Sequence, residues 1–187
     1  MRSLLTRLLT YPVERALPTI AHVAEPIRAA GMSMPTSVRT IYRDVPNLAK
    51  RYESYKREYE IPDKKQPWAF VAVSRDFDKE TGTFIYCIGD VVTTFANLPP
   101  GLEPLEIPPM AYAVIPVRPR NRLGWPFAIP AAKKYIYERW LPQSEYEPGG
   151  VIDDFEYHDE RSTRPSRPEI DLYVCIRPRS NRESQAG

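Results

Sequence analysis

The sequence predicts one pseudo-symmetric domain of strands and helices, built by an internal duplication. At 187 residues the chain is long enough for one domain with a sizeable core and too short for two full domains. Its 21 prolines against 8 glycines favour strands joined by fixed turns over a helix bundle. The order strand, helix, strand, strand occurs twice, with a period of about 80 residues, which is longer than a solenoid repeat. This pattern indicates two copies of one unit.

The first copy is expected over residues 31–92. A β-rich run at 37–42 (SVRTIY) precedes an amphipathic helix at 44–60. Residues 67–76 and 83–92 are apolar runs joined by the charged, glycine-containing turn DFDKETG, which is typical of a hairpin. The helix carries a stripe at spacings of three and four: Val45, Leu48, Tyr52, Tyr55 and Tyr59. We expect this stripe to pack in the core with its hydroxyl groups at the rim; lining a ligand cavity is the alternative.

The second copy is expected over residues 102–178, after a proline-containing linker. Residues 105–117 form a strand broken by prolines, 127–141 a helix, and 152–158 with 169–176 a hairpin. The buried stripe of this helix is expected to be Ile129, Ala132, Ile136 and Trp140. Three charged residues of the same helix are expected to face water: Lys133, Lys134 and Glu138.

Composition indicates a soluble, cytoplasmic protein. The net charge is only +2, and no apolar run approaches the roughly 20 residues of a membrane span. Cys87 and Cys175 each lie in an apolar strand pattern, which is typical of reduced core thiols. Residues 1–30 are expected to be an N-terminal extension, too interrupted by prolines for a DNA-reading helix pair. The polar tail at 179–187 is expected to be disordered.

The sequence offers no pattern for a metal, a cofactor or a nucleic acid. The chain has two histidines, His22 and His158, and no cysteine pair at ligand spacing, so neither a zinc site nor a serine triad is indicated. No glycine-rich phosphate loop occurs either. The basic run at 118–122 is short and broken by a proline, and we interpret it as a solvated loop.

Four motifs in the second copy carry a family resemblance: RWLP at 139–142, SEYE at 144–147, FEY at 155–157 and IDLYV at 170–174. They resemble the GyrI-like effector-binding domains, the ligand-sensing modules of AraC- and MerR-type multidrug-responsive regulators such as Rob and BmrR. These domains also occur as stand-alone proteins. The resemblance implies an α+β, SOUL-like fold in which two βαββ repeats form antiparallel sheets around a central cleft, with two main helices.

The resemblance also implies a site. In the family a buried glutamate on the strand after the tryptophan-bearing helix attracts lipophilic cations, and the motif places it at Glu156. Tyr173 and Trp140 match aromatic positions of the family. Further aromatic candidates for the wall of the cleft are Tyr86, Trp68, Tyr112 and Trp125.

The residues themselves support a cation site at Glu156. An ionised carboxylate in an apolar strand is costly to bury unless a partner or ligand compensates it. Aromatic faces add cation–π attraction of about 0.5–2 kcal/mol per ring. The alternative is that Glu156 is a solvated residue of an edge strand. It would then belong to an acidic patch with Asp153, Asp154, Asp159 and Glu160.

Three functions are open to such a chain. The first is a stand-alone protein that binds a lipophilic, cationic small molecule for sensing or sequestration, without a DNA-binding domain of its own. The second is a hydrolase of cyclopropane-bearing electrophiles, in which Glu156 with a raised pKa acts as general base beside Tyr173. The third is a protein inhibitor of a topoisomerase, with the acidic segment 153–160 as its contact surface. None of the three requires direct contact with nucleic acid or membrane.

Overall fold

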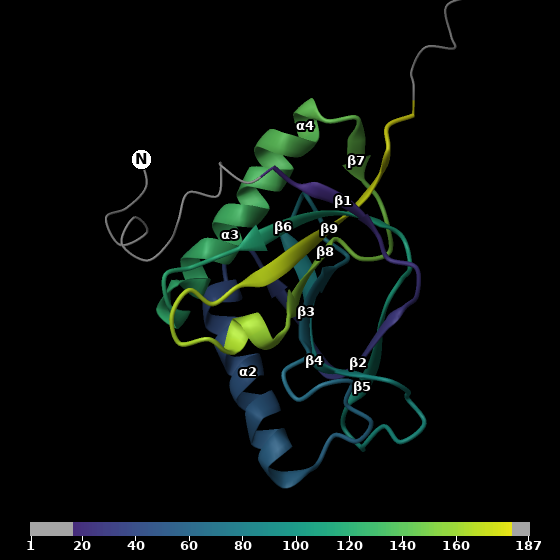
Figure 1. The fold of residues 1–187 in the computed structure, drawn as a ribbon, viewed down its shortest axis with the longest axis vertical. Coiled ribbons are helices and arrows are strands. Elements are labelled where there is room, and N and C mark those ends of the chain that lie inside the picture. The colour runs from purple at the N-terminus through teal and green to yellow at the C-terminus, as the bar shows by residue number, and fades with distance from the viewer. Residues whose placement is uncertain (1–16, 181–187) are drawn as a thin grey trace, which may run out of the picture.

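The computed structural model describes residues 17–180, which form a nine-stranded antiparallel sheet with two long helices on one face (Figure 1). The strands are β1 (Thr19–His22), β2 (Ile27–Ser37), β3 (Phe70–Arg75), β4 (Thr83–Val92), β5 (Glu103–Ile107), β6 (Ala111–Val117), β7 (Tyr146–Pro148), β8 (Asp154–His158) and β9 (Ile170–Pro178). The helices are α2 (Ile41–Glu58), α3 (Trp125–Tyr135) and the short α4 (Leu141–Gln143). A π-helical turn, Ile136–Trp140, joins α3 to α4.

The strand order confirms the duplication. Along the sheet the strands run β1-β6-β9-β8-β3-β4-β2-β5, and β7 pairs with β9. One unit is β2-α2-β3-β4 and the other is β6-α3-β8-β9, and the two units meet where β3 pairs with β8. The short leading strands are exchanged, because β1 pairs with β6 and β5 pairs with β2. The predicted α+β fold of two βαββ repeats is therefore confirmed, as one continuous open sheet.

The start of the first unit differs from the expectation. The run at 37–42 is not a strand, because β2 ends at Ser37 and α2 begins at Ile41. Hydroxyl groups make the turn between them, where Thr36 Oγ1 donates a hydrogen bond of 2.9 Å to Asp44 Oδ2. Residues 19–30, expected to lie in an extension, contribute β1 and the first part of β2 to the sheet.

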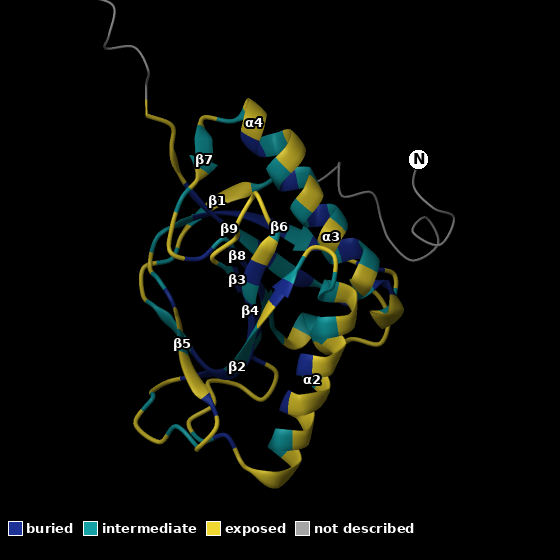
Figure 2. Cartoon of the chain, turned by 180° about the vertical axis from the view of Figure 1, so that it is seen from behind, coloured by how far each residue is buried: buried dark blue, intermediate teal, exposed yellow. Residues whose placement is uncertain are grey.

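Each face of the sheet has its own core, as the alternation of side chains along a strand requires. On the helix-covered face, α2 packs Leu48 and Tyr52 against β2 and β4. On the same face α3 packs against β6 and β9, and Ala132 of α3 and Ile136 of the π-helical turn belong to this core. The opposite face holds a third cluster that includes Phe155. Viewed from behind, the buried residues follow the strands and the inner sides of the helices (Figure 2).

The strands β2 and β4 approach each other closely at one point. Gly31 and Gly89 are direct partners in the ladder. A Cβ atom on Gly31 would lie 2.1 Å from the carbonyl oxygen of Ile88, a distance that no side chain tolerates. Glycine is therefore required at this crossing, because only a residue without a side chain lets the two backbones come this near.

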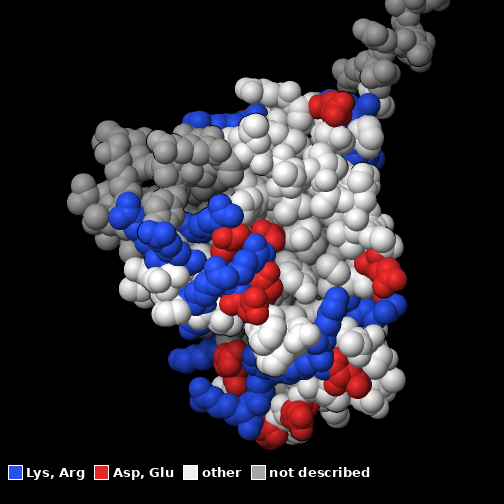
Figure 3. All heavy atoms as spheres, viewed as in Figure 1, with Lys and Arg blue, Asp and Glu red and all other residues white. Residues whose placement is uncertain are grey.

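Acidic and basic side chains intermingle on the surface (Figure 3). Arg161 bridges Asp159, Glu169 and Asp171, and Arg118 also binds Glu169. This network ties the loop after β8 to β9. Within residues 17–180, no helix is long and apolar enough to cross a lipid bilayer.

Candidate functional site

The centre of the helix-covered face lies between the two long helices. Helix α2 packs on β2 and β4, and α3 packs on β6 and β9, so the central strands β3 and β8 lie between them. On β8 the side chains alternate, and Asp154, Glu156 and His158 share the helix-covered face. The ladder places Glu156 between Ala72 of β3 and Leu172 of β9, both of which belong to the helix-covered cores.

A lysine from α3 reaches this point. The side chains of Asp154 and Glu156 are each only 5% exposed, and that of Lys133 is 21% exposed. Lys133 Nζ lies 2.7 Å from Asp154 Oδ1 and 3.5 Å from Glu156 Oε1. It also donates a hydrogen bond of 3.2 Å to Ser74 Oγ. One ammonium group therefore serves two buried carboxylates.

Further contacts of the two carboxylates come from the phenol of Tyr137 and the imidazole of His158. The hydroxyl group of Tyr137 donates to Asp154 Oδ2 at 3.1 Å. His158 Nε2 lies 3.7 Å from Glu156 Oε2. We call these six residues the β8 ionic cluster: Ser74, Lys133, Tyr137, Asp154, Glu156 and His158.

Aromatic rings border the β8 ionic cluster. The ring of Phe70 meets that of His158 edge to face, with centroids 5.4 Å apart. The Trp125 ring lies 6.1 Å from the same imidazole. Tyr86 is buried on β4, where the ladder places it opposite Ser74. The cluster therefore combines carboxylates with aromatic surface, a chemistry that suits organic cations.

The surroundings of Lys133 and Glu156 favour the charged form of both groups. Burial alone would lower the pKa of Lys133, but the charges of Asp154 and Glu156 outweigh it and raise that pKa. Burial alone would likewise raise the pKa of Glu156, but its contacts with His158 and Lys133 hold the pKa below its usual value. Burial, together with the charge of Glu156, raises the pKa of Tyr86 well above its usual value, so this phenol stays neutral.

These charges do not balance. Asp154 and Glu156 share the single ammonium group of Lys133, so these two carboxylates carry one negative charge more than that ammonium can compensate. Asp154 Oδ1 is buried and accepts no hydrogen bond of good geometry, although Lys133 lies beside it. Buried charge without full compensation is costly, and it is a recognised feature of functional sites.

The comparison with known proteins identifies the family. The family model of Cass2, the integron-associated effector binding protein, matches residues 24–176. The chain belongs to the Cass2 family. The resemblance to GyrI-like effector-binding domains is thereby confirmed. No curated protein sequence matches this Cass2-family chain.

Solved structures share the fold of this Cass2-family chain at low sequence identity. SAV2435 bound to tetraphenylphosphonium matches with a TM-score of 0.65 and 9% identity, over 86% of this chain and 93% of that chain. The integron cassette protein from Vibrio cholerae matches with a TM-score of 0.59 and 10% identity, over 86% and 96%. The C-terminal domain of EcmrR matches with a TM-score of 0.57 and 10% identity, over 88% and 99%.

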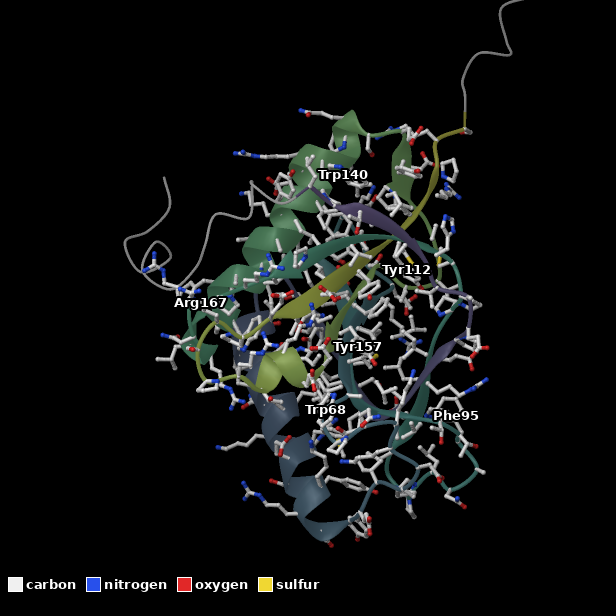
Figure 4. All side chains as sticks on the ribbon, viewed as in Figure 1. Trp68, Phe95, Tyr112, Trp140, Tyr157 and Arg167 are labelled. Atoms are coloured by element: carbon white, nitrogen blue, oxygen red, sulfur yellow. The ribbon has the colours of Figure 1, made fainter. Side chains whose placement is uncertain are left out.

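The structure of the Cass2-family chain brings together only some of the predicted site residues. Tyr86 and Trp125 lie near Glu156, as described above. Tyr173 lies on the opposite face, where it stacks on Phe155 with ring centroids 4.4 Å apart. Tyr112 meets the same Phe155 ring edge to face at 5.2 Å. Figure 4 shows Tyr112 and Tyr157 within the space that the curved sheet encloses.

Two predicted tryptophans lie away from Glu156. Trp140 is stacked on Tyr146 near the end of the helix that continues α3 (Figure 4). Trp68 precedes β3 and is 38% exposed. Sequence spacing could not separate these rings from the nearby ones, because it does not reveal how the strands pair.

One hollow of about 170 Å³ lies away from Glu156, on the opposite face of the sheet next to β2 and β5. Residues that line it include Gly31, Ser33, Arg75, Cys87, Leu105 and Ile152. Pockets for drug-sized ligands occupy roughly 300–1,000 Å³, so this hollow is too small for such a ligand. We therefore base the candidate site on the β8 ionic cluster.

Two of the alternatives that the sequence left open for this region, and one expectation, are wrong. Glu156 is not a solvated edge residue, because β8 is central and covered. Its pKa is lowered rather than raised, because Lys133 and His158 lie beside it. Lys133 does not face water, although Lys134 does. A signal for Lys133 was present, since it follows Ile129 by four positions and precedes Ile136 by three, on the edge of the buried stripe.

The described residues offer no metal centre. Between residues 17 and 180, no group of three or more histidine, cysteine or acidic side chains could hold an ion. Cys87 and Cys175 are buried free thiols, as expected.

Proposed function

We propose that this chain binds a small, lipophilic, singly charged cation on the helix-covered face, with Asp154 and Glu156 as counter-charges. Three observations support the proposal. The chain belongs to an effector-binding family. SAV2435, which shares the fold, was solved with bound tetraphenylphosphonium. The observation that carries the proposal is the excess negative charge buried in the β8 ionic cluster.

The physical reason is charge compensation in a site that contains little water. A buried carboxylate needs a partner, and Lys133 can neutralise only one of the two. A lipophilic cation would supply the missing positive charge and lose little hydration on entering the site. Its apolar groups would meet the rings of Phe70, Tyr86 and Trp125, which border the cluster.

The test is calorimetric titration with tetraphenylphosphonium. We expect Glu156→Gln to weaken binding by about tenfold or more, which corresponds to about 1.4 kcal/mol. Glu138→Gln is the matched control, because Glu138 is exposed on the helix that continues α3 and pairs with Lys134. The control variant should bind like the wild type.

An uncharged ligand separates charge from shape. Triphenylphosphine oxide keeps three of the phenyl groups but carries no net charge. We expect the wild type to prefer tetraphenylphosphonium, and Glu156→Gln to lose most of that preference. Equal binding of the cation by the wild type and by Glu156→Gln would refute the role of the carboxylate.

The two other functions lose their support. Hydrolysis by a Glu156–Tyr173 pair would need both groups at one point, whereas they lie on opposite faces of the sheet. The lowered pKa of Glu156 also makes it a weak general base. The segment 153–160 is not an open acidic surface, because Asp154 and Glu156 are buried and Asp159 is paired with Arg161.

A further inference from the structure

Lys133 occupies the position that a bound cation would need. Its ammonium group contacts both buried carboxylates and the hydroxyl oxygen of Ser74. A ligand cation placed against Asp154 and Glu156 would meet this ammonium at the same oxygens. Two positive charges cannot share that place without strong repulsion.

The carboxylates are also out of reach while Lys133 stays in place. The side chains of Asp154 and Glu156 are each 5% exposed. Among the polar groups that contact these carboxylates, the ammonium group of Lys133 can move most easily, because it sits on a flexible four-carbon stem. Its side chain is already 21% exposed, so a route from the cluster to water exists. The helix changes to a π-helical turn at Ile136, three residues later, and such turns are frequent at functional sites.

We propose that Lys133 is a built-in competitor: a tethered cation that closes the site in the free protein and swings into water when a ligand cation takes its place. This inference rests on the proposed function. It adds that Lys133 controls access to the site and that this control favours one class of cation. The ligand must compete with an ammonium group that is already in position. The apparent affinity is therefore the intrinsic affinity reduced by the fraction of molecules in which Lys133 has left.

The competition selects a class of ligand. A primary ammonium ligand would make the same contacts as Lys133 and would also lose its own strong hydration, so it gains nothing by the exchange. A bulky cation with a shielded or delocalised charge, such as a phosphonium or a quaternary ammonium, loses little hydration. It also gains contact with the aromatic rings beside the cluster. The site should therefore favour such cations over primary amines of equal size.

The first experiment removes the competitor at constant charge. The double variant Lys133→Met/Asp154→Asn keeps Glu156 and the single excess negative charge of the cluster. We expect it to bind tetraphenylphosphonium about tenfold more tightly than the single variant Asp154→Asn, or better, because both variants lack Asp154 and only the single variant keeps a tethered cation that has to leave. Lys134→Met is the matched control, since Lys134 is the neighbouring lysine and is exposed. Its affinity should not change. An affinity of the double variant equal to or below that of Asp154→Asn would overturn the inference.

The second experiment uses the wild type and does not depend on how the variants fold. Lysines are labelled with acetic anhydride in the absence and presence of saturating tetraphenylphosphonium, and each site is quantified by mass spectrometry. Lys133 should react slowly in the free protein and several-fold faster in the complex, while Lys134 reacts at one rate in both. A Lys133 that is equally protected in the complex would overturn the inference.

The outcomes separate this inference from the proposed function. Absence of binding, or binding that Glu156→Gln leaves unchanged, overturns both. Binding that depends on Glu156, with no gain in the double variant and no exposure of Lys133, overturns the gate alone. Binding that depends on Glu156, with both effects at Lys133, supports both.

Discussion

Replacing Lys133 by methionine should show how strongly the β8 ionic cluster depends on its one lysine. The substitution keeps the length and apolar stem of the side chain and removes the charge. It leaves two carboxylates, each 5% exposed, without their ammonium partner. Breaking a buried ion pair on one side costs about 3–5 kcal/mol. Because the Lys133 side chain is 21% exposed, water can reach part of the gap, and we expect a loss of about 3 kcal/mol at neutral pH.

The stability lost on replacing Lys133 should depend on pH, and the carboxylates of the cluster determine whether this loss grows or shrinks as the pH rises. In the variant Lys133 no longer opposes burial, while His158 stays beside Glu156, so we expect the pKa of Glu156 to rise relative to the wild type. A rise in the folded pKa of a carboxyl group removes stability at pH values above that pKa and none at pH values well below it. The deficit relative to wild type should therefore be larger at about pH 8 than at about pH 5.

Urea unfolding of both proteins at the two pH values measures this deficit. Lys134→Met serves as the control and should lie within about 0.5 kcal/mol of the wild type, because that lysine is exposed. A loss at Lys133 that is as small as the control, or that does not change with pH, would refute the argument that its charge compensates buried carboxylates.

Three further substitutions test other parts of the account by urea unfolding. Gly31→Ala should destabilise the fold by about 3 kcal/mol or more, since its Cβ would lie 2.1 Å from the Ile88 carbonyl oxygen; a loss below about 1 kcal/mol would contradict the close crossing. Phe155→Ala should cost about 3–5 kcal/mol through the loss of a fully buried ring, and a surface-like cost would be inconsistent with its stacking on Tyr173. Glu156 has a lowered folded pKa, so its contribution is present above about pH 4.3 and is lost as the pH falls through the folded pKa. Glu156→Gln should accordingly flatten the acid side of the stability curve, and an unchanged slope there would count against an ionised Glu156.

The sequence predicted the repeated units because their signals are local. Alternating apolar runs, a charged hairpin turn and two helical stripes each occupy a short window, and they recur in the same order. The exchange of β1 and β5 between the units was not predictable, because it is a pairing between segments far apart in the chain. The run at 37–42 was mistaken for a strand because its β-branched residues outweighed the hydroxyl-rich turn at Thr36.

The site was predicted in part for the same reason. Glu156 was identified from the motif around it, which is contiguous in sequence. The face on which each aromatic residue lies depends on the register of β8 against β9, where Phe155 pairs with Tyr173 and Glu156 with Leu172. That register is tertiary information. Lys133 was missed because its partners lie on another element, and only its place at the edge of the buried stripe hinted at them.

A crystal structure of the chain with tetraphenylphosphonium would test the central claim most directly. We expect the phosphonium beside the carboxylates of Asp154 and Glu156, with phenyl groups against Trp125 and Phe70 and with the Lys133 ammonium turned into solvent. A ligand bound on the opposite face, in the hollow beside Cys87, with Lys133 still paired to Asp154, would contradict the account.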